Sequence, residues 1–159
     1  MQLSSSERYE MKIALGSDHG GYLLKKEITD FLTSRSIEVL DVGTDSDASV
    51  DYPDFGEKVA RLVASGDADS GIVVCGTGIG ISIAANKIPG IRAALVTDTF
   101  MAKMAKEHNN ANIIALGGRV IDQSRACEII AAWLDSTFEG GRHQARLDKI
   151  AQLEKAFCR

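Results

Sequence analysis

Residues 71–87 read GIVVCGTGIGISIAANK, and this stretch decides the fold. Ile72 to Val74 is an apolar, β-branched run, which is typical of a strand buried on both faces. Residues 75–80 form a loop in which every second residue is glycine, and residues 79–87 have helix-compatible spacing. A strand, a glycine-rich turn and a helix N-terminus together predict an anion site, because unpaired backbone N–H groups point out of the turn with the helix dipole behind them.

The glycine loop differs from the two common nucleotide-binding motifs. A Walker loop ends in Gly-Lys-Ser/Thr, and no lysine stands at that position. A dinucleotide fingerprint needs G-x-G-x-x-G, whereas Gly76, Gly78 and Gly80 are spaced two apart. Cys75 stands at the tip of the strand, where backbone donors can stabilise a thiolate. It is therefore a candidate reactive thiol, although a small buried residue that ends a strand would show the same pattern.

The composition indicates one ordinary globular domain. Of the 159 residues, 25% are charged and 45% hydrophobic, and the formal net charge is −4. An acidic chain argues against a nucleic-acid partner, which needs a basic face. Cys75, Cys127 and Cys158 lack C-x-x-C spacing, which argues against a disulfide framework and a zinc site and favours a reducing cytoplasm. No apolar run reaches transmembrane length, so we expect no membrane partner.

We expect residues 1–10 to be a disordered N-terminal extension, because they are polar and lack an apolar signal core. Residues 11–159 are expected to form a single domain that ends in a helix beginning near Arg142. Strands are predicted over residues 12–16, 38–42, 72–74, 91–96 and 113–116. Amphipathic helical patterns alternate with these strands, which predicts an α/β fold: a Rossmann-like three-layer sandwich around a five-stranded parallel sheet.

Parallel sheets bind ligands beyond the carboxyl ends of their strands. This rule groups residues that are distant in sequence: Asp18 and His19 after the first strand, Cys75 and Thr77 after the third, and Arg119 after the fifth. Each also has a purely structural interpretation, such as a turn or cap for Asp18 and a solvated side chain for Arg119.

Three further positions are candidates outside this group. His108 lies at a predicted helix C-terminus, where the dipole favours an imidazolium with or without a function. Tyr52 could be a half-buried core residue. Arg142 and Arg146 are i, i+4 on one helix face, and such a pair repels itself unless an anion lies between the two charges.

Six segments resemble ribose-5-phosphate isomerase B, and they run in order from about Lys12 to about Ile150. They are GSDHGG (16–21), DYPD (51–54), CGTGIGISIAANK (75–87), EHNNAN (107–112), GGRV (117–120) and FEGGRH (138–143). The resemblance implies an aldose–ketose isomerase of the pentose phosphate pathway, acting through a cis-enediolate without metal or organic cofactor. Allose-6-phosphate and galactose-6-phosphate isomerases share much of this framework, so the substrate stays open among the three sugar phosphates.

The resemblance also assigns roles residue by residue. Cys75 matches the base that moves a proton between C1 and C2; another branch of the family uses a glutamate a few residues later, and residues 79–82 carry none here. Thr77 matches a residue that assists ring opening or hydrogen-bonds the sugar, and His108 matches the ring-opening acid/base. The substrate-binding matches are Asp18 and Asn109 for sugar hydroxyls, Tyr52 for the sugar pocket, and His19, Arg119, Arg142 and Arg146 for the phosphate. The N–H groups of Gly76 to Gly80 are expected to stabilise the oxyanion.

The family's active site lies between two subunits, so a homodimer with shared sites is implied, and pairing of dimers into tetramers stays open. An apolar stripe of Leu147, Ile150, Leu153 and Phe157 on the last helix is a surface that a partner could cover. Residues 155–159 lie outside the matched pattern. Two other function classes remain: a phosphosugar-binding module without turnover, and a thiol enzyme in which Cys75 forms a covalent intermediate.

Overall fold

The computed structural model describes residues 11–157. The expected N-terminal extension, residues 1–10, and Cys158 lie outside the described residues. The strands are β1 (Lys12–Ser17), β2 (Glu38–Asp41), β3 (Ser70–Cys75), β4 (Ala93–Leu95) and β5 (Ile113–Gly117). The helices are α1 (Tyr22–Ser34), α2 (Tyr52–Ser65), α3 (Ile79–Ala85), α4 (Thr99–Glu107), α5 (Gln123–Leu134) and α6 (Arg142–Phe157), with a 3-10 turn at His19–Gly21.

The strands form one parallel sheet in the order β2-β1-β3-β5-β4, which confirms the predicted fold class. β3 lies in the middle, and all six of its residues are buried. A parallel strand covered by helices on both faces has no solvent side, so an unbroken Ile-Val-Val run is the expected sequence there. The strand order reverses direction between β1 and β3, which makes this the switch point of the sheet.

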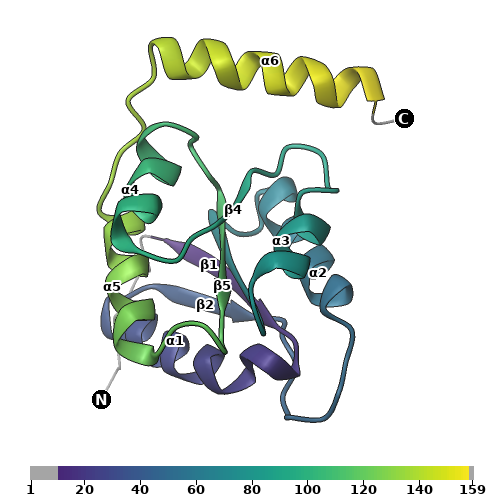
Figure 1. The fold of residues 1–159 in the computed structure, drawn as a ribbon, viewed down its shortest axis with the longest axis vertical. Helices are drawn as coiled ribbons and strands as arrows, with labels where there is room; N and C mark the ends of the chain where they lie inside the picture. The colour runs from purple at the N-terminus through teal and green to yellow at the C-terminus, as the bar shows by residue number, and fades with distance from the viewer. Residues whose placement is uncertain (1–10, 158–159) are drawn as a thin grey trace, which may run out of the picture.

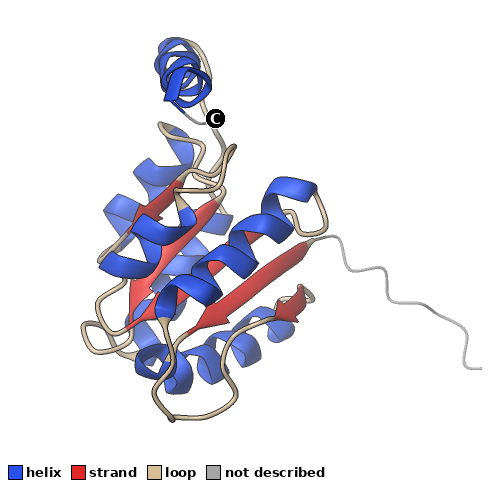
Figure 2. Cartoon of the chain, turned by 90° about the vertical axis from the view of Figure 1, so that its right-hand side faces the viewer, coloured by secondary structure: helices blue, strands red, loops and turns tan. Residues whose placement is uncertain are grey.

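Helices cover both faces of the sheet, as Figure 2 shows. On one face, α1, α4 and α5 pack against alternate residues of β1, β3 and β5, with Trp133 fully buried among them. On the other face, α2 and α3 pack against the intervening residues of the same strands. Side chains that alternate along a strand therefore enter two separate cores, and this alternation fixes the register of the three central strands.

The helix boundaries follow local signals in the sequence. Asp98 caps α4 by accepting a hydrogen bond from the Met101 N–H at 2.7 Å, and α2 ends at Gly66 in the left-handed region (φ 83°). The predicted strand over 91–96 is shorter than expected. The N–H groups of Arg92 and Ala93 donate to the side chains of Asn112 and Asn86 instead of to a further strand, because β4 is an edge strand.

Helix α6 lies apart from the three layers, beyond one end of the sheet (Figure 1). Only His143 and Leu147 of this helix are buried, and Glu154 accepts a hydrogen bond from the Gly90 N–H at 3.0 Å. Ile150 and Leu153 are 50% and 59% exposed, so the predicted apolar stripe is largely uncovered in the single chain. None of the helices in residues 11–157 combines the length and apolar character that crossing a membrane requires.

Candidate active site

Three loops meet at the carboxyl edge of the sheet, as the sequence predicted. The Asp18 N–H donates to the Val74 carbonyl at 3.2 Å, and the Gly118 N–H donates to the Cys75 carbonyl at 2.8 Å. The loops are too close for side chains, because a Cβ on Gly118 would lie 2.5 Å from the Gly20 carbonyl oxygen. The first, third and fifth strands therefore deliver their following residues into one compact cluster.

Cys75 lies at the base of the glycine-rich turn and is 4% exposed. Its Sγ accepts a hydrogen bond from the Gly78 N–H at 3.1 Å, and Gly78 itself adopts the left-handed conformation (φ 79°) directly before α3. A backbone donor aimed at sulfur stabilises negative charge there. Thr77 is exposed beside it, and its Oγ1 accepts from the Ile79 N–H at 3.2 Å. Two of the N–H groups that we expected to face an oxyanion are thus already used within the turn.

Polar side chains line the mouth of this turn. The Asp18 carboxylate is buried and accepts from the Gly20 N–H at 2.8 Å. His19 Nδ1 accepts a hydrogen bond from the Val50 N–H at 3.2 Å, so the proton of the neutral ring is on Nε2. His19 can therefore donate from Nε2 to an anion without giving up its bond to the loop.

Tyr52 and Arg119 approach the two ends of the same turn. A Cβ on Gly80 would lie 2.5 Å from the Tyr52 ring, and a Cβ on Gly76 would lie 3.0 Å from the Arg119 guanidinium. Glycine at these positions lets an aromatic ring and a guanidinium lie directly against the backbone. We call Asp18, His19, Tyr52, Cys75, Thr77 and Arg119 the carboxyl-edge group.

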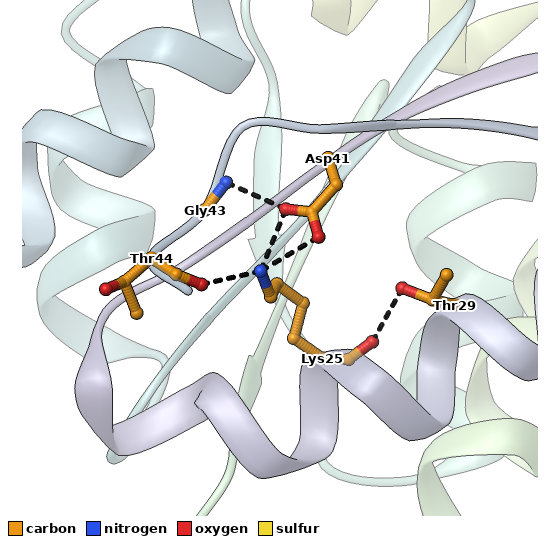
Figure 3. A network of polar contacts seen from close by, with 5 residues as sticks. All are labelled: Lys25, Thr29, Asp41, Gly43 and Thr44. Carbon is orange, nitrogen blue, oxygen red and sulfur yellow. Dashed lines mark hydrogen bonds and ion pairs between the residues drawn. The ribbon is translucent and has the colours of Figure 1, made fainter. Parts of the chain in front are cut away.

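A buried lysine holds the loop between β2 and α2, which leads into Tyr52, and sequence reasoning missed this lysine (Figure 3). Lys25 Nζ lies 2.9 and 2.8 Å from the two carboxylate oxygens of Asp41 and 2.6 Å from the Thr44 carbonyl oxygen. The Thr44 N–H in turn donates to the Ser17 carbonyl at 3.0 Å. The sequence signal for a buried amine was the position of Lys25 beside Leu24, on the apolar face of α1.

The remaining predicted site residues lie at the opposite edge of the sheet. His108 and Asn109 follow α4 and precede β5, and the nearby Asn112 carbonyl accepts from the Gly71 N–H near the start of β3. Cys75 ends β3. The five residues of β5 at about 3.3 Å each put roughly 16 Å between the two edges. One chain therefore does not bring His108 to Cys75.

Arg142 and Arg146 lie on this same side of the molecule, one turn apart on α6. Both side chains are exposed, and neither has an ion-pair partner among residues 11–157. The expectation that an anion lies between these two guanidinium groups stays a prediction. We call His108, Asn109, Arg142 and Arg146 the amino-edge group.

His108 has two neighbours that the sequence did not single out. Its ring stacks on that of His143, with centroids 4.1 Å apart and an interplanar angle of 13°. Glu139 Oε2 lies 3.3 Å from His143 Nε2 and 4.0 Å from His108 Nε2. Donor atoms of all three residues lie within 4.8 Å of one another. The nitrogen lone pairs of the two stacked rings lie in nearly parallel, separate planes, however, so they do not converge on one point as metal ligands must.

These features define a doubly wound α/β protein with a glycine-rich turn at the switch point of its sheet. The chain belongs to the Ribose/Galactose Isomerase family, whose model matches residues 13–150. It is 47% identical over 144 residues to ribose-5-phosphate isomerase B of Escherichia coli (strain K12), covering 91% of this chain and 97% of the relative.

Two solved structures show the same likeness in three dimensions. The fold matches Clostridium thermocellum ribose-5-phosphate isomerase B with a TM-score of 0.92 at 60% identity, covering 92% of this chain and 99% of that one. Ribose-5-phosphate isomerase B of Mycoplasma genitalium, solved with bound ribulose-5-phosphate, matches with a TM-score of 0.87 at 43% identity, covering 93% and 99% of the two chains.

Proposed function

We propose that this protein is an aldose–ketose isomerase that interconverts D-ribose 5-phosphate and D-ribulose 5-phosphate. The observation that carries the proposal is Cys75, a thiol that receives a backbone N–H in the glycine-rich turn and is surrounded by polar side chains. The relatives named above support it, since they are ribose-5-phosphate isomerases B and one was solved with ribulose-5-phosphate. Both described cysteines are free thiols, which fits a reducing cytoplasm.

The reaction moves one proton between two neighbouring carbons. In the open-chain aldose, the Cys75 thiolate removes the proton from C2, and the electron pair moves to the carbonyl oxygen on C1 to give a cis-enediolate. The same group returns the proton to C1 as the carbonyl forms at C2. Free N–H groups of the glycine turn and the Thr77 hydroxyl are placed to stabilise the oxygen that carries the charge. His19 and Arg119 supply donors for the phosphate from this edge.

We infer that a second copy of the chain completes each site. The roles assigned to His108, Asn109, Arg142 and Arg146 require them near Cys75, but they lie at the other edge of their own chain. Exposed apolar side chains are present at both ends: Ile79, Ile83, Phe100 and Met101 near the carboxyl edge, and Ile150, Leu153 and Phe157 on α6. A two-fold dimer that pairs these surfaces brings the amino-edge group of one copy to the carboxyl-edge group of the other.

An NMR assay in deuterated water tests the proposed function. We expect conversion of ribose 5-phosphate to ribulose 5-phosphate, with solvent deuterium at the carbon that receives the proton. Turnover with complete retention of substrate hydrogen would contradict proton transfer through Cys75. Binding without turnover would indicate a silent phosphosugar-binding module, and a mass increase on Cys75 would indicate a covalent thiol enzyme. Allose 6-phosphate and galactose 6-phosphate in the same assay measure the preference among the family's sugar phosphates.

A further inference from the structure

We propose that Glu139 and His143 are positioning residues for ring opening, and that they act through His108. The proposal rests on the function proposed above, in which His108 opens the sugar ring before Cys75 moves the proton. It adds two residues whose only role in the reaction is to hold the imidazole of His108 in the orientation that ring opening requires.

The contacts around His108 form a rigid support. His143 is 6% exposed and presents its ring face to His108, which limits rotation of the half-buried imidazole of His108. Glu139 faces the Nε2 atoms of both rings with one carboxylate oxygen, at 3.3 and 4.0 Å. The Nε2 edges of the two imidazoles are thus drawn to the same side of the stack, which leaves the Nδ1 edge of His108 directed elsewhere.

The backbone fixes Glu139 in place on this pair. Its N–H donates to the Glu107 carbonyl at 3.0 Å, which ties the loop before α6 to the end of α4. Gly140 and Gly141 follow in left-handed conformations (φ 68° and 56°), and the His143 N–H donates back to the Gly140 carbonyl at 3.1 Å. Two consecutive left-handed residues favour glycine, and the turn that they form lies between Glu139 and His143.

Ring opening is the step that depends on orientation. The acid/base must take the proton from O1 and deliver a proton to O4 as the C1–O4 bond breaks, which gives the aldehyde and the 4-hydroxyl. Ribose 5-phosphate is a closed furanose, whereas ribulose 5-phosphate has no five-membered ring available because its O5 carries the phosphate. The equilibrium constant ties kcat/KM of the two directions together, so a ring-opening defect lowers net conversion both ways. Exchange of the C1 hydrogen of ribulose 5-phosphate with solvent, in contrast, passes only through the enediolate and needs no ring step.

This difference gives a test with a built-in control. We expect Glu139→Ala to lower kcat from ribose 5-phosphate by roughly 10- to 100-fold with little change in KM, within what a positioned acid/base contributes. Deuterium uptake at C1 of ribulose 5-phosphate, which needs no ring step, should stay within about 2-fold of the wild type. Glu139→Gln keeps an oxygen but loses the charge, so its defect should be smaller. Glu128→Gln removes a carboxylate from an exposed pair with Arg125 and should be neutral.

A double variant shows whether Glu139 acts through His108. In a His108→Asn background, Glu139→Ala should cause no further loss in the aldose direction, because the group that it positions is already absent. An equal loss in deuterium uptake at C1 of ribulose 5-phosphate, or a full additional loss in the His108→Asn background, would show that Glu139 has only a structural role. A Glu139→Ala protein as active as Glu128→Gln would also overturn the proposal. Wild-type protein inactive in both directions would instead contradict the proposed function itself.

Discussion

At the scale of single residues, the chemistry is concentrated in a turn where glycine makes three things possible. Gly78 adopts a positive φ directly before α3, and its N–H donates to the Cys75 sulfur. Gly80 and Gly76 leave room for the Tyr52 ring and the Arg119 guanidinium. The turn thus places a thiol beside a backbone donor, with an aromatic ring at one end and a cation at the other.

Replacing Cys75 tests its role as the base. We expect Cys75→Ala to lower kcat by at least about 100-fold with little change in KM, because a general base acts in the transition state and not in binding. Cys127→Ala is the matched control and should be close to neutral. Cys127 lies on α5, and burial, together with the nearby Glu27, raises the pKa of its thiol. Steady-state kinetics give both constants, and a near-normal kcat in Cys75→Ala would show that another group is the base.

At the scale of elements, the loop between β2 and α2 depends on one buried amine. Lys25 neutralises Asp41 and satisfies the Thr44 carbonyl, and the same loop donates the Val50 N–H to His19 and leads into Tyr52. A lysine that is only 5% exposed in its side chain thus holds the loop that contacts His19 and leads into Tyr52, the residues proposed to bind the phosphate and the sugar.

Substituting this lysine should affect both stability and substrate binding. We expect Lys25→Met to lower the free energy of unfolding by about 1–3 kcal/mol, since the Thr44 carbonyl loses its partner. KM should rise because the loop is released. Lys26→Met is the control: its amine is exposed and lies 4.6 Å from the Tyr22 ring centroid, which is worth about 0.5–1 kcal/mol at most. Urea unfolding measures the difference, and equal midpoints for the two variants would contradict this role.

In the proposed function, helix α6 contributes the guanidinium groups of Arg142 and Arg146 to the phosphate. Each charge-assisted contact is worth about 1.5–3 kcal/mol, so Arg146→Ala should lower kcat/KM by roughly 10- to 150-fold. Arg125→Ala removes an exposed guanidinium that pairs with Glu128 on α5 and should leave kcat/KM unchanged. Free ribose should be a very poor substrate for the wild type. Comparable turnover of ribose and ribose 5-phosphate would contradict a phosphate role for α6.

The sequence predicts those features that depend on local periodicity. Alternating strands and helices define the parallel sheet. The rule that residues after the carboxyl ends of parallel strands gather at one edge correctly places Asp18, Cys75 and Arg119 together. Features that are set by tertiary contacts cannot be predicted from this periodicity. The position where β4 starts depends on the side chain of Asn86, which accepts from the Ala93 N–H. The burial of Lys25 depends on Asp41 of β2, sixteen residues away. No periodicity indicates such side-chain contacts.

The environment of His108 shows the same limit. Its position at the end of α4 follows from helix signals, but its stack on His143 depends on how the loop between α5 and α6 folds back on α4. The sequence likewise gives no indication that the Gly78 and Ile79 N–H groups would be used within their own turn.

At the scale of the whole molecule, the proposed site is divided between the two edges of one sheet. In this proposal, the carboxyl-edge group holds the base, and the amino-edge group holds the ring-opening residue and two arginines. Separation along β5 prevents the groups from meeting within one chain. In a two-fold dimer, a contact from one edge to the other occurs twice, so two complete sites form from two chains.

A mixture of two inactive variants tests this division. Cys75→Ala and His108→Asn homodimers should each convert ribose 5-phosphate very slowly, because every site lacks one of the two residues. When equal amounts are unfolded and refolded together, about half of the dimers should be mixed. In each mixed dimer, one site combines the intact Cys75 of one chain with the intact His108 of the other, so roughly a quarter of the wild-type activity should return. If both residues came from the same chain, no mixed dimer could hold an intact site. Native mass spectrometry gives the fraction of mixed dimers, and refolded mixtures that contain them but stay as inactive as the parents would rule out the shared site.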